Sequence, residues 1–412
     1  MSWTKLTLQV RTPLFGGDDP RHDDGGAVRV PSIRGVLRFW FRAVASGHHV
    51  SDLGEIWKAE QAVFGSTSTP SVIRLRIPKQ PTVSSQHRKP DWAISERLAK
   101  RPGFDGAQYL LGQGLWDYER GLRRGCVEPG QSFDLDIRFD RDEQVNSRFM
   151  LALWAWLTYG GLGCRTRRGF GQLVCTAVDG DLPCHWTLDN LKPPSGVAGW
   201  ENLGACAVPD LLPGRAALGW GDLLQAPPPK TDSHPEIPTL SPRWWAGTVL
   251  ETRAGSLGEA LHRAGLRWRR FRAADDDARG RKPSQNTRSP EWLNSIHGDD
   301  DRYPIAAFGL PIGYFSSASG FKATVTPELG GAPLRRASPV WLRPILLPKG
   351  RWGVFTHVFY SRLLPKDAVL RISTGTSTLS VPSDEVVEEA WDCWLHGDPR
   401  LPDDYFPRRE HA

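Results

Sequence analysis

The chain has 412 residues and a formal net charge of +6, with 39% hydrophobic residues as in ordinary globular proteins. This length exceeds what one hydrophobic core usually supports, so two domains are expected. No apolar run reaches the roughly 18 residues that a membrane-spanning helix needs. The N-terminal MSWTKLTLQV lacks the apolar core of a signal peptide, so a cytoplasmic location is expected. The basic excess is modest, so it favours an acidic partner such as nucleic acid only where the charge is local.

The six cysteines do not predict a metal site. No CxxC occurs, and the one Cys/His pair, Cys184 and His185, has no second pair at zinc-ligand spacing. Reduced and mostly buried thiols are expected instead. An acidic loop at 18–24 contains His22, but its spacing is too loose to predict a bound cation. No metal and no cofactor are therefore predicted.

The first half of the chain alternates strand and helix patterns. Residues 5–11 alternate polar and apolar side chains, and residues 33–45 have the spacing of an amphipathic helix with Ser32 as its N-cap. Further elements are expected at 52–64 (helix), 71–77 (strand), 132–139 (strand), 149–157 (buried helix) and 170–178 (strand), with an insertion at 78–104. This order is the β-α-β-β-α-β pattern of a ferredoxin-like fold.

The second half begins after a proline-rich stretch, which is typical of a connector. Elements are expected at 257–271 (helix), 303–315, 321–327, 340–347 and 353–360 (strands or apolar runs) and 383–395 (helix capped by Ser383). The predicted fold class is α+β, with two ferredoxin-like (RRM-like) domains that carry long insertions. Their expected bounds are 1–190 and 243–412, with the connector at 191–242.

A glycine- and arginine-rich loop, YGGLGCRTRRGFGQ, occupies residues 159–172. Glycine permits close backbone approach, exposed N–H groups can bind an anion, and arginine presents a planar fork that suits phosphate. The loop therefore predicts a site for a polyanion backbone, although a solvated surface turn is the ordinary alternative. Its candidate contacts are Gly160, Gly161, Gly163, Arg165, Arg167, Arg168, Gly169, Phe170 and Gly171.

An arginine stripe marks the helix expected at 33–45. Arg34, Arg38 and Arg42 follow each other at intervals of four residues, with no acidic residue at i±4. Such a row of like charges is mildly unfavourable, so an external anion is the preferred explanation over a solvated charged face. Most of the 18 tryptophans are expected in the core, and an exposed one would stack on an unpaired base.

Six motifs follow one another along the chain. They are TPLFGGDDP at 12–20, PSIRGVLRFWFRA at 31–43, ExxxFGS at 60–66, GGLGCRTRRGFG at 160–171, FGLPIGY at 308–314 and RRASPVWLRP at 335–344. With them the chain resembles the RAMP superfamily of CRISPR-associated proteins and, within it, the first-numbered RAMP subunit of the type III-B (Cmr) effector complex. The glycine-rich loop alone indicates the superfamily, and PSIRG together with RRASP indicates the subunit.

The resemblance implies two ferredoxin-like domains and a non-catalytic RNA-binding subunit. It implies CRISPR RNA, target RNA and other Cmr-type subunits as partners, with contacts toward the 3′ end of the CRISPR RNA and cleavage in another subunit. Arg335 and Arg336 of RRASPVWLRP join the candidate RNA contacts. The stretches at 78–130 and 190–240 depart from the family pattern, so no role is carried over to them.

Two other function classes remain open from the sequence. A metal-independent endoribonuclease that processes CRISPR RNA precursors needs an acid and a base, and His22, His48 and His49 are candidates, although solvated loop histidines are more ordinary. A protein–protein adaptor would use the same arginines on acidic surfaces. No GxxxxGK[ST] motif occurs, which argues against a nucleoside triphosphatase.

Overall fold

The computed structural model describes residues 2–16, 28–47, 52–93, 106–205, 233–273, 303–315, 322–373 and 378–397. The chain divides into two compact units. The first comprises Met1–Asp232, Ile237–Ala264 and Trp341–Phe359, and the second comprises Ser233–Glu236, Gly265–Val340 and Tyr360–Ala412. This division differs from the expected one, in which a connector at 191–242 separated two domains. Two segments of the second half, Ile237–Ala264 and Trp341–Phe359, belong to the first unit.

A four-stranded antiparallel sheet forms the base of the first unit, in the order β2-β5-β1-β6. Its strands are β1 (Thr4–Val10), β2 (Arg74–Arg76), β5 (Ser132–Arg138) and β6 (Leu173–Asp179). The main helices between them are α1 (Val30–Gly47), α2 (Leu53–Phe64) and α4 (Glu143–Tyr159). The order of these elements along the chain is the predicted one, and it includes α2, which the sequence predicted at 52–64.

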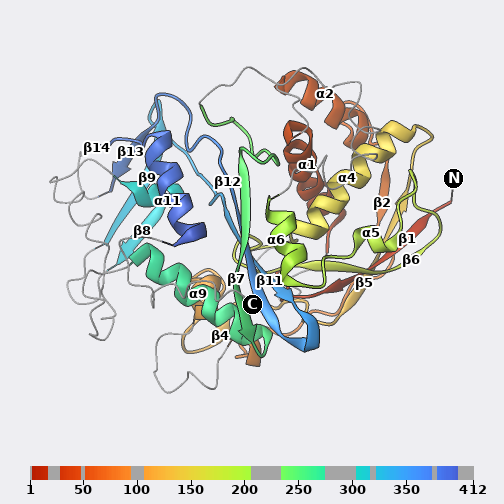
Figure 1. The fold of residues 1–412 in the computed structure, drawn as a ribbon, viewed down its shortest axis with the longest axis horizontal. Coiled ribbons are helices and arrows are strands. Elements are labelled where there is room, and N and C mark those ends of the chain that lie inside the picture. Colours follow the sequence, from red (N-terminus) through yellow and green to blue (C-terminus); the bar gives the residue numbers. More distant parts are fainter. Residues whose placement is uncertain are drawn as a thin grey trace. The chain divides into compact units, whose positions relative to one another are not determined.

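Alternation along β1 explains how the sheet forms one half of a core. Leu6, Leu8 and Val10 are fully buried, while the residues between them are half-buried on the other face. Helices α1 and α4 pack against each other in the red-to-yellow part of the ribbon (Figure 1), and the rings of Trp40 and Tyr159 stack at 5.9 Å between them.

The helix starts differ from those expected. Helix α1 begins at Val30 rather than after Ser32. Pro31 is compatible with this start, because the first turn of a helix makes no internal use of the N–H group that proline lacks. Helix α4 begins at Glu143, six residues before the apolar run that predicted it. Asp142 fixes this start, since its side chain accepts hydrogen bonds from the N–H groups of Gln144 and Val145.

A second sheet of the first unit has the strand order β11-β12-β7. It contains β7 (Trp245–Ala254), β11 (Val340–Leu346) and β12 (Trp352–Phe359). Helix α5 (Leu188–Leu191) ends where the connector was expected to begin, and α6 (Val197–Ala205) forms within the expected connector. Helix α6 lies close to β7, since a Cβ at Gly204 would be 2.2 Å from the carbonyl oxygen of Gly247. This packing brings the sequence-distant β7 and β12 into the first unit.

The second unit contains another antiparallel sheet, in the order β10-β9-β13-β14 with β8 also paired to β9. Its elements are η2 (Pro304–Phe308), β8 (Ile312–Phe315), β9 (Lys322–Leu329), β10 (Ala332–Pro333), β13 (Val369–Ile372), β14 (Thr378–Leu379) and α11 (Asp384–His396). Helix α9 (Leu257–Ala273) runs from the first unit into the second. The described strands of this unit do not follow the β-α-β-β-α-β order. The reason is that β11 and β12 pair with β7 in a separate sheet.

The structure corrects one of the elements expected in this half. The expected strand at 303–315 is a 3-10 turn followed by the short β8, and Pro304 and Pro311 lack the N–H group that a strand ladder uses.

The shorter elements of the chain are η1 (Asp91–Ala93), α3 (Gly106–Leu111), β3 (Trp116–Asp117), β4 (Gly121–Leu122) and η3 (Pro348–Gly350). Among the described helices, none is long and apolar enough to cross a bilayer.

Candidate nucleic-acid interface

The glycine-rich loop lies against the protein's own backbone. Gly171 has a φ of +71°, its N–H donates to the carbonyl oxygen of Pro13 at 2.9 Å, and a Cβ there would be 1.9 Å from the carbonyl oxygen of Leu162. At Gly163, φ is +90° and a Cβ would be 2.1 Å from the carbonyl oxygen of Phe15. Close packing within the chain therefore already requires these glycines.

Other candidate contacts of the loop are covered. The carbonyl oxygen of Gly161 accepts a hydrogen bond from Trp156 Nε1 at 3.1 Å. Phe170 is 0% exposed, and its ring centroid is 5.8 Å from that of Phe15. Gly160, Gly161, Gly169 and Gly171 are buried as well. These residues build the loop, and their side chains and backbone are not available to a ligand at the surface.

Arg165 is the residue that the loop presents to solvent. It is exposed, with a φ of +62°, and its carbonyl oxygen accepts a hydrogen bond from the N–H of Arg168 at 2.8 Å. Its guanidinium lies over a second glycine, since a Cβ at Gly112 would be 2.7 Å from Arg165 Nη2. Among the described residues, none forms a salt bridge with Arg165.

The other two loop arginines are attached to β11. The N–H of Leu342 donates to the carbonyl oxygen of Arg167 at 3.1 Å, and Arg168 forms an isolated parallel bridge with Leu342. The guanidinium of Arg167 lies 4.9 Å from the ring centroid of Trp341 and 5.7 Å from that of Phe39. Arg167 therefore makes cation–π contacts within the first unit.

The arginine stripe of α1 has an acidic partner that comes from α2. Glu60, whose side chain is 1% exposed, accepts hydrogen bonds from Arg38 Nη1 at 2.8 Å and from Arg42 Nη2 at 2.9 Å. Arg38 also donates to the carbonyl oxygen of Gly65 at 2.6 Å, and the bond to Glu60 raises the pKa of the Arg42 guanidinium. Arg38 and Arg42 therefore have an acidic partner, which α2 provides and α1 does not. Arg34, by contrast, forms no salt bridge with a described residue, and its Nε makes no hydrogen bond.

The two candidate arginines of the second unit differ from each other. Arg335 is exposed. Arg336 is half-buried and donates from Nη2 to Ser361 Oγ at 2.6 Å, and burial lowers the pKa of its guanidinium. Only Arg335 presents a side chain that a ligand can reach without breaking an internal hydrogen bond.

Two basic residues near the loop were missed by the sequence-based prediction. Arg343 of β11 is 3% exposed and donates to the carbonyl oxygens of Gly160 at 2.7 Å and Leu157 at 2.8 Å, and burial lowers the pKa of its guanidinium to about 9. Arg124 donates to the carbonyl oxygen of Gly16 at 2.9 Å. A single charge inside the apolar run at 340–347 was the signal that pointed to Arg343.

The alternative catalytic residues His22, His48 and His49 lie outside the described residues. Within the described ranges, no group of three or more His, Cys, Asp or Glu side chains has the arrangement of a metal site. The described cysteines are free thiols, and burial raises the pKa of Cys126 and Cys175 to about 11.

Known proteins match this chain in sequence and in fold. The RAMP superfamily is matched over residues 7–174. The CRISPR system Cmr subunit Cmr1-1 of Pyrococcus furiosus is 33% identical over 156 residues, which is 38% of this chain and 42% of that protein. Subunit Cmr1-2 of the same organism is 27% identical over 177 residues, which is 40% of this chain and 91% of that protein. The chain thus spans less than half the length of the first of these relatives.

The fold likeness extends further than the sequence likeness. The crystal structure of Cmr1 from Pyrococcus furiosus in its apo form aligns over 98% of both chains, with a TM-score of 0.54 and 18% identity. This alignment shows a shared fold across both units. The matches in sequence confirm the resemblance found in the motifs: residues 7–174 match the RAMP superfamily, and the chain is similar to the Cmr1 subunits of the CRISPR system of Pyrococcus furiosus.

Proposed function

We propose that this chain is a non-catalytic RNA-binding subunit of a type III-B CRISPR RNA-guided effector complex that acts in antiviral defence. It would contact the CRISPR RNA, the target RNA or both, and assemble with other Cmr-type subunits. The similarity to proteins that are named Cmr subunits supports this assignment. In such a system base pairing with the guide supplies sequence specificity, so the protein needs only to hold the backbone.

One observation carries the RNA-binding part of the proposal, namely the exposed Arg165. The loop holds it at positive φ, over Gly112, in a region where no described residue neutralises its charge by a salt bridge. Positive φ is costly for an arginine, so the fold that maintains it holds the backbone of Arg165 in place. A guanidinium without a salt-bridge partner suits a phosphate oxygen.

The structure narrows the set of contacts that we propose. Arg165, Arg335 and Gly163 are exposed and Arg34 is half-buried, and these four remain as candidate contacts. We assign structural roles to the others, because they are buried or already bound within the protein: Gly160, Gly161, Gly169, Phe170 and Gly171 by packing, Arg167 and Arg168 by β11, Arg38 and Arg42 by Glu60, and Arg336 by Ser361.

We also propose a ferredoxin-like character for the β2-β5-β1-β6 sheet with α1 and α4. Its strand order places the first and third strands of the motif at the centre, which supports this interpretation. A ferredoxin-like origin of the second unit is the weaker part of the proposal, because its described strands have another order.

The salt dependence of RNA binding tests the proposed function. We expect the purified full chain to bind single-stranded RNA with an affinity that falls as KCl rises. The double variant Arg34→Gln/Arg165→Gln should flatten the slope of log K against log salt by about 0.7 per lost contact, and so by about 1.4 in total. Arg74→Gln, at an exposed arginine on the edge strand β2, is the matched control and should leave the slope unchanged.

Two results would contradict this assignment. One is a slope that is the same in the double variant and the wild type, with melting temperatures that show both to be folded. The other is site-specific cleavage of labelled repeat RNA in EDTA that is lost in His22→Ala or His48→Ala/His49→Ala, because that would identify the chain as an endoribonuclease.

A further inference from the structure

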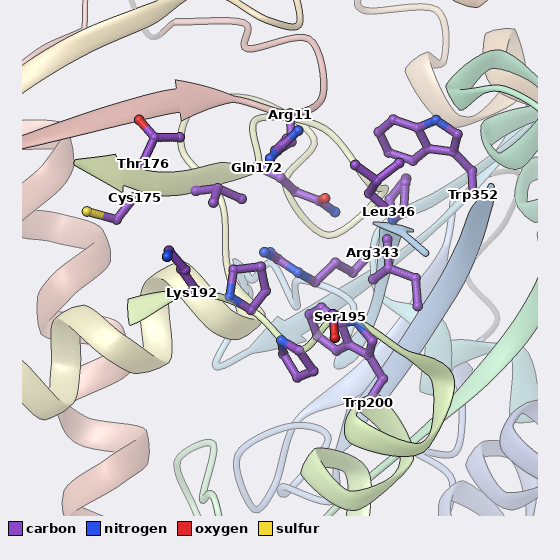
Figure 2. Close-up of a pocket in the computed structure, with 15 residues that line it drawn as sticks. Arg11, Gln172, Cys175, Thr176, Lys192, Ser195, Trp200, Arg343, Leu346 and Trp352 are labelled. Atoms are coloured by element: carbon purple, nitrogen blue, oxygen red, sulfur yellow. The ribbon is translucent and has the colours of Figure 1, made fainter. Parts of the chain in front are cut away.

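A pocket of about 320 Å³ lies in the first unit, between the start of β6, the segment that joins α5 to α6, and β11. Figure 2 shows Arg11, Gln172, Lys192, Trp200 and Arg343 around this space. They come from the end of β1, the end of the glycine-rich loop, the two sides of the α5–α6 turn, and β11. The fold therefore gathers polar side chains from five distant points of the sequence.

Three buried hydrogen-bond donors of this pocket have no acceptor among the described residues. Gln172 and Trp200 are each 2% exposed, and Arg343 is 3% exposed. Within the described part of the chain, Gln172 Nε2, Trp200 Nε1 and Arg343 Nε have no hydrogen-bond partner. A buried donor left unsatisfied is destabilising, so three of them in one pocket indicate that an acceptor belongs there.

The charge of the pocket has one sign. Its lining includes Arg11, Lys192 and Arg343, and no Asp or Glu among the described residues. Lys192 is engaged at the rim with Asp189 at 2.8 Å, and the carboxylate of Asp189 is 85% exposed. Arg11 forms no salt bridge with any described residue, and burial lowers the pKa of its guanidinium. A half-buried cation without a counter-ion among the described residues favours an anionic ligand.

Most of the remaining lining is apolar, with Thr176 and Ser195 as the polar exceptions. Pro193, Leu346 and Trp352 line the pocket beside the charged groups. Its volume is at the lower end of the roughly 300–1,000 Å³ that small-molecule sites occupy. A ligand that fits must therefore be small, with an acceptor-rich anionic end and a flat or apolar remainder.

We propose that this pocket binds the phosphate monoester of a nucleotide, either a free mononucleotide or the terminal nucleotide of an RNA strand. A phosphate monoester offers three acceptor oxygens to the unsatisfied donors, and its charge of nearly −2 complements Arg11 and Arg343. The base or ribose lies against the apolar wall. The RNA-terminus form rests on the proposed function, whereas the free-nucleotide form does not.

Calorimetric titration of the full-length protein tests the pocket. The probes are inorganic phosphate, adenosine, adenosine 5′-phosphate, adenosine 3′-phosphate, and one oligoribonucleotide with a 5′-phosphate, a 3′-phosphate or only hydroxyl ends. We expect at least one nucleoside monophosphate to bind about tenfold or more tightly than adenosine. Preference for a phosphorylated oligonucleotide over the hydroxyl form identifies the RNA terminus as the source, and its absence identifies the free nucleotide.

Variants locate the binding. Arg11→Gln removes the half-buried cation, and Gln172→Leu removes the unsatisfied amide at similar volume. Each should weaken nucleotide binding about tenfold, which corresponds to 1.4 kcal/mol, while Arg74→Gln should not change it. If both pocket variants fail to fold, the comparison of nucleotide with nucleoside on the wild-type protein still decides the outcome.

The proposal is overturned if no nucleoside monophosphate binds more tightly than adenosine, or if folded Arg11→Gln and Gln172→Leu bind like the wild type. Salt-dependent RNA binding alongside such a result would leave the proposed function intact. Nucleotide binding without any affinity for longer RNA would instead contradict the proposed function and retain the pocket.

Discussion

Arg343 Nη1 donates a hydrogen bond to the carbonyl oxygen of Gly160 at 2.7 Å, and Nη2 donates to that of Leu157 at 2.8 Å. Gly160 is the C-cap of α4, where the helix leaves its last carbonyl groups without internal partners. A cation at this end is also favoured by the helix dipole. The buried Arg343 of β11 thus caps the C-terminus of α4, the helix that precedes the glycine-rich loop.

Replacement of this side chain should destabilise the first unit. Arg343→Met keeps much of the volume but leaves the carbonyl oxygens of Leu157 and Gly160 without their donor, so we expect a loss of about 2–4 kcal/mol in the free energy of unfolding. Urea denaturation followed by tryptophan fluorescence measures it. Arg351→Met is the control at a nearby exposed arginine and should change stability by about 0.5 kcal/mol or less. Equal midpoints for the two variants would refute the capping role of Arg343.

Glu60 should matter more for stability than for RNA binding. Glu60→Gln keeps the shape and removes the charge that Arg38 and Arg42 share, so we expect a loss of about 1–3 kcal/mol, limited because both arginines are partly exposed and can hydrate. Thermal or urea unfolding measures the loss, and filter binding measures the RNA affinity. We expect no gain in affinity. A gain would show that the released arginines reach RNA and would restore them to the proposed contacts.

Gly171 should not accept a side chain. Gly171→Ala places a Cβ 1.9 Å from the carbonyl oxygen of Leu162 in addition to the cost of positive φ. Gly130→Ala carries the second cost alone, because φ is +90° there and nothing lies within 4 Å of the added atom. We expect the first variant to be less stable than the second by about 1–3 kcal/mol in urea denaturation. Equal stability would show that the loop backbone relaxes freely.

His357 should make the first unit sensitive to acid. The ring is buried, accepts a hydrogen bond from Trp245 Nε1 at 3.1 Å and lies 3.3 Å from the carbonyl oxygen of Tyr159, and burial lowers its pKa from 6.5 to about 3. The unfolded chain therefore binds one more proton between these two pH values, so this contribution to stability is fully present above pH 6.5 and is lost as the pH falls toward 3.

A variant that does not titrate isolates this effect. In the wild type the loss should follow a slope of about 1.4 kcal/mol per pH unit on top of the change that all other groups cause. His357→Gln should lack that extra slope, so the stability difference between the two proteins should shrink from pH 7 to pH 5. Parallel curves of urea midpoint against pH would exclude His357 as the source.

Local patterns in the sequence were sufficient for many elements of the first unit. The alternation at 5–11 predicted β1, and the alternation at 132–139 predicted β5, because period-2 burial is a property of the strand itself. Boundaries were less accurate, since Asp142 sets the start of α4 by a side-chain hydrogen bond that lies outside the apolar run. The motifs also indicated the resemblance to the RAMP superfamily, which is matched over residues 7–174.

The glycine-rich loop, the α1 arginine stripe and the pocket needed the tertiary structure. The sequence by itself determined that glycines and arginines concentrate at 159–172, and that Arg38 and Arg42 have no acid on their own helix. Only the fold decided that α2 delivers Glu60 to them, that β11 fixes Arg167, and that Arg165 stays exposed. The physical reason is that partners distant in sequence determine which charges are satisfied. Local periodicity reports burial and carries no information about such partners.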